Sequence, residues 1–144
     1  TPDFIADHSN FLIFKNIISG MGYIMYENEI YITGSYFGGY GITGMALADI
    51  NQDGCYELYY TYSCGSGIPR SEIGYFDPVT GDTVVFDEAF FLSQIMLTGD
   101  EAGDLCVRTA KTAERDSMVE YSIEAEDFLG RIVNENNKIT LIVD

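Results

Sequence analysis

The stretch SEIGYFDPVTGDTVVF, residues Ser71 to Phe86, decides the fold class of this sequence. An alternating run from Ile73 to Phe76 leads into the segment DPVTG (77–81), and a second run returns from Thr83 to Phe86. Proline fixes φ near about −65° and glycine accepts a positive φ, so this segment is typical of a tight turn. Two strand-like runs around such a turn predict an antiparallel β-hairpin.

Similar patterns recur along most of the chain. Four segments (27–34, 55–62, 103–109 and 136–143) each place a polar turn before an alternating strand, as stacked hairpins or blades would. The sequence therefore predicts a mainly β fold, an antiparallel meander or sandwich with propeller-blade-like hairpins and at most one or two short helices. The remaining predicted strands are two around a turn at Glu27-Asn28 (22–34), YELYYTYS (56–63), LCVRTAKT (105–112), VEYSIEA (119–125) and a last hairpin turning at 135–137 (130–144).

Two stretches leave helix and strand open. SNFLIFKNIISGMG (9–22) offers Ser9 or Asn10 as a helix N-cap and Gly20 as a stop. DEAFFLSQIMLTGDEAGD (87–104) offers Asp87 as an N-cap, with apolar residues at helical spacing after it. Because short apolar runs do not distinguish a helix from a buried strand, both alternatives stand for each stretch.

Composition limits the classes of function. The 144 residues, 47% of them hydrophobic, suit one domain spanning 1–144, and no linker divides them. The 7 Lys+Arg and 23 Asp+Glu residues give a formal charge of −16. Such a field repels nucleic acid and anionic lipid surfaces and attracts divalent cations, so we exclude nucleic acid as a partner. No apolar run approaches the roughly 20 residues that span a bilayer, so we do not expect a membrane-embedded chain.

The three cysteines, Cys55, Cys64 and Cys106, do not decide the cellular compartment. Cys55 and Cys64 flank a predicted strand, whose extended backbone would hold their Cα atoms about 30 Å apart. A disulfide needs about 7 Å or less, which excludes that pair. Cys106 could meet either of the others across a sheet, but buried free thiols are the favoured state.

The segment DINQDG (49–54) places oxygen-bearing side chains on alternate residues between two apolar stretches. Asp49, Asn51 and Asp53 would occupy positions one, three and five of a calcium loop, in which alternate side chains turn inward around the ion. Gly54 at position six allows the sharp turn, and the backbone carbonyl of Cys55 would serve at position seven. The spacing predicts a calcium site, and the alternative is an Asx-rich turn that binds no ion.

The end of this loop shows which kind of calcium loop it is. An EF-hand requires a bidentate Glu at position twelve, where this chain has Tyr60, and it requires flanking helices, where this chain has strand-like sequence. The next acidic side chain is Glu57, at position nine, which gives the pattern D-x-[DN]-x-D-G-x-x-[DE] followed directly by a strand.

At these residues the sequence resembles the calcium loops of FG-GAP and VCBS-type repeats, which occur in integrin-like β-propellers and bacterial surface proteins. GITGMALADINQDGCYEL (41–58) looks like their small-residue strand, acidic loop and apolar strand. The following segment 60–82 is similar to a domain of secreted proteins and lipoproteins of Gram-positive anaerobes. The resemblance covers about 36–86, the calcium-loop hairpin region, and implies these metal ligands: Asp49, Asn51, Asp53, the Cys55 carbonyl and Glu57.

The resemblance does not extend to a whole propeller. A propeller needs four or more four-stranded blades, which 144 residues of ordinary blade length do not supply. The chain is therefore either a fragment with two or three blade-like sheets or, as we expect, a compact meander or sandwich that carries one calcium-loop hairpin.

Catalytic patterns are weak in this sequence. His8 is the only histidine and lies near a terminus, and CGSGIPRS (64–71) lacks the G-x-S-x-G spacing of a nucleophile elbow. The aromatic stretch YFGGY (36–40) could stack on a sugar, although packing by its own rings is favoured in a chain without Trp. Arg70 could bind an anion or pair with a nearby carboxylate, and the pairing is favoured. Adjacent acids that could serve glycoside hydrolysis, but are favoured as a solvated face, are Asp87-Glu88 and Asp100-Glu101.

The function predicted from the sequence is a non-catalytic, calcium-stabilised surface or recognition module, with a cell-surface protein or glycan as partner. The alternative is a small glycan-active hydrolase or a carbohydrate-binding accessory domain. Three carboxylates and a neutral amide suggest calcium binding in the roughly 10⁻⁴ to 10⁻³ M range of extracellular modules. A site this weak would be empty at cytosolic calcium, so we expect an extracellular or cell-surface-anchored domain whose targeting segment is absent from this chain.

Overall fold

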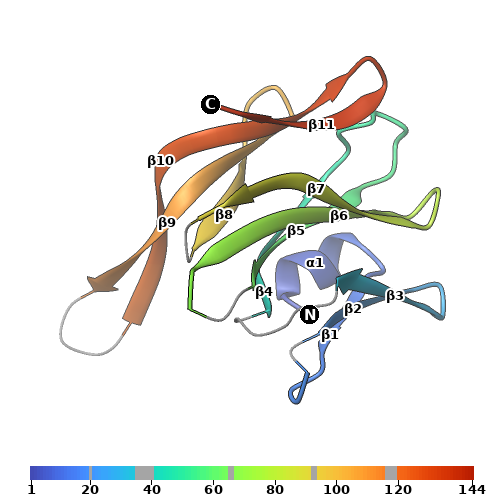
Figure 1. Cartoon of the computed structure of the whole chain (residues 1–144). Helices are drawn as coiled ribbons and strands as arrows, with labels where there is room; N and C mark the ends of the chain where they lie inside the picture. Colours follow the sequence, from blue (N-terminus) through green and yellow to red (C-terminus); the bar gives the residue numbers. More distant parts are fainter. Residues whose placement is uncertain (20, 35–40, 65–66, 92–93, 116–119) are drawn as a thin grey trace.

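The computed structural model of the chain describes residues 1–19, 21–34, 41–64, 67–91, 94–115 and 120–144, which form three antiparallel β-sheets and one short helix (Figure 1). The mainly β prediction is therefore confirmed. A three-stranded sheet in the order β1-β2-β3 lies at one end of the molecule, beside the helix. The helix is α1 (Asp3–His8), and the three strands are β1 (Leu12–Lys15), β2 (Gly22–Tyr26) and β3 (Glu29–Gly34).

The second sheet is a four-stranded meander in the order β4-β5-β6-β7. It contains the hairpin predicted from residues 71–86. The Asp77 carboxylate accepts hydrogen bonds from the backbone N–H groups of Val79 (2.8 Å) and Thr80 (3.3 Å), and Gly81 has a φ of +75° that suits glycine. The strands of this sheet are β4 (Gly41–Ala48), β5 (Glu57–Cys64), β6 (Arg70–Asp77) and β7 (Asp82–Phe90).

The third sheet is a second meander, in the order β11-β10-β9-β8. Asn136 and Asn137 both have positive φ in the predicted turn before the last strand, and Glu27 and Asn28 do the same in the predicted turn between β2 and β3. Both hairpin predictions are therefore confirmed. The strands of this sheet are β8 (Ile95–Gly99), β9 (Leu105–Arg115), β10 (Glu120–Glu135) and β11 (Lys138–Val143).

The two four-stranded sheets face each other as a sandwich. At one side β4 lies against β8, and at the other β7 lies against β11. Each sheet has the antiparallel order of a propeller blade, but the two enclose a shared core rather than a channel. The buried side chains of this larger core are Ala48, Ile50, Tyr59, Ile73, Phe90, Ile95, Leu97, Leu105, Val107, Ile132, Ile139 and Leu141.

Strand β5 is buried on both faces. Tyr59 points into the larger core, while Leu58, Tyr60 and Tyr62 point the opposite way into a smaller core shared with α1 and the three-stranded sheet. Gly74, opposite Tyr60 on β6, leaves room for that ring, because a Cβ at Gly74 would lie 2.7 Å from it. The smaller core consists of Ile5, Phe11, Ile24, Leu58, Tyr60, Tyr62 and Phe76.

The two stretches left open between helix and strand form strands. In 9–22, β1 pairs with β2, and the Asn16 side chain then accepts hydrogen bonds from Ile18 N (2.9 Å) and Ser19 N (3.1 Å), which form a turn. In 87–104, Phe90 ends β7 and Ile95 begins β8. Both side chains enter the larger core.

The one helix among the described residues, α1, was not predicted. It is 6 residues long, too short to show a helical repeat. The carbonyl of Pro2 accepts from Ile5 N and Ala6 N, both at 3.1 Å, and the Ser9 hydroxyl donates to the Ile5 carbonyl at 2.6 Å. Ser9, an expected N-cap, thus lies at the end of a helix rather than at the start of one.

Candidate metal centre

The acidic loop connects β4 to β5, two adjacent strands in which Ala48 pairs with Glu57. Asp49 therefore follows directly after one strand, and Glu57 begins the next. The antiparallel pairing brings these two acids to the same end of the sheet, although eight positions separate them in the sequence.

The loop is held by its own carboxylates. Asp49 accepts at Oδ1 from Asp53 N and at Oδ2 from Gly54 N, each at 3.0 Å. Asp53 Oδ1 accepts from Cys55 N at 2.8 Å, and Asn51 Oδ1 accepts from Asp53 N at 3.0 Å. Gly54 has a φ of +90°, which an L side chain would strain. Each carboxylate oxygen has a second lone pair, so these bonds orient the acids without preventing them from ligating a cation.

Glu57 is the buried member of the site, with a relative exposure of 1%. Its Oε2 accepts from Ile50 N and from the Tyr59 hydroxyl, both at 2.9 Å. Its Oε1 is also buried and has no hydrogen-bond partner among the residues that the structure describes. Burial raises the pKa of Glu57 to about 7, and the Asp49 charge adds to that rise, although the two hydrogen bonds oppose it.

The distances among three carboxylates are compatible with one shared cation. Asp49, Asp53 and Glu57 each offer a carboxylate oxygen, and these atoms lie within 4.8 Å of one another. Two oxygens bound to the same calcium at about 2.3 to 2.6 Å can be at most about 4.6 to 5.2 Å apart. Within the described parts of the chain, no other trio of His, Cys, Asp or Glu side chains meets this distance.

The other predicted ligands lie in the same loop. Asn51 donates from Nδ2 to Asp53 Oδ2 at 3.1 Å, and its own Oδ1 faces the Asp53 backbone. Cys55 is exposed with a free thiol, so the expectation of buried cysteines is wrong here, whereas Cys106 is free and buried. The role of the Cys55 carbonyl as a ligand stays a prediction.

Two residues that support the loop were missed in the sequence. The Tyr59 hydroxyl donates to one oxygen of Glu57. Burial raises the pKa of Tyr59 above its ordinary value, so the hydroxyl keeps the proton that it donates. Asn134 on β10 donates from Nδ2 to the Asn51 carbonyl at 3.4 Å. The alternating pattern of β5 could have placed Tyr59 on the face of Glu57. No local signal links Asn134 to a loop 83 positions away.

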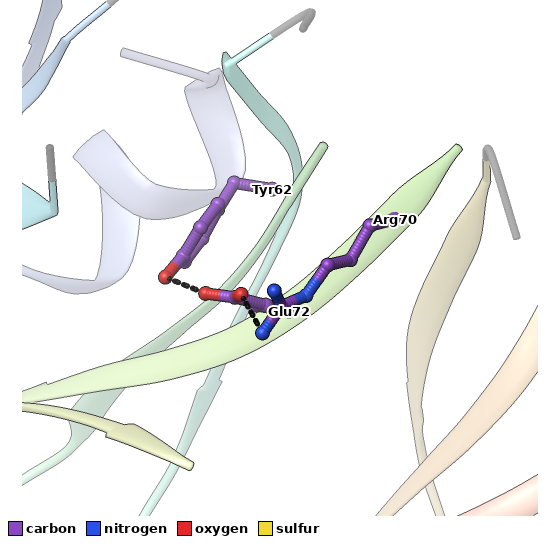
Figure 2. A network of polar contacts seen from close by, with 3 residues as sticks. All are labelled: Tyr62, Arg70 and Glu72. Atoms are coloured by element: carbon purple, nitrogen blue, oxygen red, sulfur yellow. Dashed lines mark hydrogen bonds and ion pairs between the residues drawn. The ribbon is translucent and has the colours of Figure 1, made fainter. Parts of the chain in front are cut away.

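Several other polar groups that the sequence singled out have structural partners. Figure 2 shows Glu72 between two of them: its Oε2 accepts from the Tyr62 hydroxyl at 2.6 Å, and its Oε1 pairs with Arg70 at 2.7 Å. The predicted pairing of Arg70 with a carboxylate is therefore confirmed. His8 Nδ1 lies 2.9 Å from the Phe4 carbonyl, and Asp100 Oδ1 accepts from Ala102 N and Asp104 N. The stretch 36–40 and Ser66 lie outside the described residues.

Comparison of the chain with protein-family models, with curated proteins and with solved structures found no match. The resemblance to FG-GAP and VCBS-type repeats therefore stays a prediction from the sequence of residues 36–86.

Proposed function

We propose that this chain is a non-catalytic, calcium-stabilised module that acts outside the membrane in surface attachment or recognition. One observation carries the calcium assignment: Glu57 Oε1 is buried in the acidic cluster without a hydrogen-bond partner among the described residues. A buried carboxylate oxygen with no partner is unfavourable, and a bound cation would satisfy it.

The ion would have a structural task. It would cancel the repulsion among Asp49, Asp53 and Glu57 and hold the junction between β4 and β5. Glu57 is linked to the larger core through Tyr59, and the loop is linked to β10 through Asn134. Binding at the loop would therefore stabilise the contact between the two sheets of the sandwich.

Calcium fits the ligands better than magnesium. Magnesium requires a near-ideal octahedron at about 2.1 Å, whereas calcium accepts the irregular set that one loop offers. Binding in the roughly 10⁻⁴ to 10⁻³ M range would fill the site only at extracellular calcium levels. The extracellular or cell-surface location rests on this argument, and a surface protein or glycan is the partner that we propose for a module at that location. None of the described residues forms a helix that is long and apolar enough to cross a membrane.

Two hollows that the described residues line lack the carboxyl arrangement of a glycan hydrolase, which supports the non-catalytic proposal. A hydrolase needs two carboxyl groups on opposite sides of a cleft. One hollow, of about 390 Å³, has no carboxylate in its lining, which is Phe4, His8, Met45, Ala46, Leu47, Tyr56, Gly99 and Leu105. A second hollow, of about 220 Å³, is lined by Asp87 and Glu88 among others, but these two neighbours come from the same strand.

Calorimetric titration of the EDTA-treated chain with calcium chloride tests the assignment, together with thermal unfolding in EDTA and in calcium. We expect binding below about 1 mM and a higher melting temperature in calcium. Asp49→Ala should abolish both effects. Asp100→Ala is the matched control, because it removes an equivalent turn-capping carboxylate at another loop and should leave both effects intact. No binding at about 5 mM calcium would refute the proposal.

A further inference from the structure

The three-stranded sheet is apolar on both faces. Its inner face packs Ile13, Ile24 and Tyr31 against the smaller core. The strand register places two further cross-strand rows on the opposite face, since neighbouring residues of a strand point to opposite sides. These outward rows are Leu12, Met25 and Ile30 in the first, and Phe14, Tyr23 and Ile32 in the second.

None of the six strand residues that the register places on the outward face is charged. Its largest exposed members, Leu12, Phe14, Ile30 and Ile32, are between 47 and 63% exposed. Its one polar atom, the Tyr23 hydroxyl, lies 3.8 Å from Met21 Sδ. An antiparallel sheet with one face in water normally alternates apolar and polar residues, so a sheet that is apolar on both faces indicates a second covering layer.

We propose that a second copy of this chain covers the outward face, so that the two β1-β2-β3 sheets pack face to face about a two-fold axis. Sheets stack about 10 Å apart with their side chains interdigitated, and an isologous contact pairs the same patch on both copies. A face of aliphatic and aromatic groups complements itself, because its side chains carry no charge and its hydroxyl, on Tyr23, already lies against Met21 Sδ.

The exposed area agrees with a weak dimer. The four large side chains of the face expose on the order of 400 Å². We include Ile17 and Ile18 of the turn after β1 in the proposed contact; they are 95 and 98% exposed and would contribute roughly 300 Å² more. A stable interface of standard size buries about 800 Å² on each partner. We therefore expect a Kd of about 10 to 500 µM.

Net charge opposes this dimer. Each copy carries −16, so long-range repulsion should weaken association at low ionic strength. Because the contact itself is uncharged, salt should screen the repulsion without weakening the apolar packing. Dimerisation should therefore strengthen as sodium chloride is raised from about 0.05 to 0.5 M.

Sedimentation equilibrium of the full chain up to about 1 mM protein tests the proposal. It is run in calcium and in EDTA, so that failure of the calcium site and failure of this interface are separate results. Ile30→Glu and Ile30→Lys should each raise the Kd at least about tenfold, since either charge would be buried in the interface. The matched control Ile68→Glu changes an exposed isoleucine outside the sheet and should change the Kd less than about twofold.

The two charged variants separate apolar packing from bulk charge. If association depended only on the net charge, Ile30→Lys would strengthen it and Ile30→Glu would weaken it. Weakening by both supports the proposed interface, provided that circular dichroism shows both variants folded. A monomer at all concentrations, or a dimer unchanged in both variants, would overturn it and leave the face to a different partner.

Discussion

Glu57→Gln should stabilise the calcium-free protein and remove its response to calcium. The amide keeps the size of the carboxylate and carries no charge. Its oxygen can accept from Ile50 N and from the Tyr59 hydroxyl, as Glu57 Oε2 does. Its NH₂ group would take the place of the unpartnered Oε1 and donate into the acidic cluster.

The magnitude follows from the pKa of Glu57. Burial raises it from 4.5 to about 7, and each pKa unit corresponds to about 1.4 kcal/mol. At pH 8 without calcium, the charged Glu57 should therefore lower the free energy of unfolding by about 3 kcal/mol. Glu57→Gln should recover about 2 to 3 kcal/mol of this, which raises the melting temperature by about 5 to 10 °C in a chain of this length.

Calcium should narrow or reverse the difference in the free energy of unfolding between Glu57→Gln and the wild type. With a Kd of 10⁻⁴ to 10⁻³ M, about 10 mM calcium stabilises the wild type by about 1.4 to 2.7 kcal/mol. The variant lacks a ligating oxygen at this position and should gain little. Thermal and urea unfolding at pH 8, in EDTA and in about 10 mM calcium chloride, measures both effects.

Glu72→Gln is the matched control. It makes the same substitution on β6, where Tyr62 and Arg70 already satisfy the carboxylate, and it should destabilise equally in EDTA and in calcium. Equal destabilisation by Glu57→Gln in EDTA and in calcium would contradict this prediction, because Glu57 would then be an ordinary paired carboxylate.

Two further predictions follow from the same structure. In EDTA the free energy of unfolding of the wild type should fall as pH rises from about 5 to 8. The raised pKa of Glu57 stabilises the fold fully below pH 4.5, and this stabilisation is lost as pH rises through about 7. Urea unfolding should show this trend in the wild type and not in Glu57→Gln. Gly74→Ala should destabilise by about 1 to 3 kcal/mol by denaturant titration, because its Cβ would lie 2.7 Å from the buried Tyr60 ring, whereas the same change at the open position Gly99 should have a smaller effect.

Local turn chemistry made the hairpins predictable. The segment 77–81 and the turns at Glu27-Asn28 and Asn136-Asn137 have residues that favour the backbone angles these turns need. The layers could not be predicted in the same way. Alternation within β5 does not say that both of its faces are buried, and nothing in residues 12–34 shows which face of the small sheet meets α1.

In the candidate site, too, the features set by local backbone geometry were predictable and those set by distant packing were not. The spacing of Asp49, Asn51 and Asp53 predicted a loop that turns its oxygens inward, because that depends only on local backbone geometry. The burial of Glu57 depends on the larger core covering its face of β5. The contact from Asn134 depends on β10 crossing the loop from the opposite sheet. Such distant packing leaves no trace in the local pattern.

The central position of β5 has a consequence for how the molecule opens. Since both cores need this one strand, neither can come apart alone without exposing aromatic rings that belong to the other. In native-state hydrogen exchange, the amides of β5 should therefore exchange only with an opening free energy equal to the global free energy of unfolding. The two cores should open as one cooperative unit. The loop before Glu57 is attached directly to that unit, so an ion bound there should slow exchange throughout both cores and not only in its own turn.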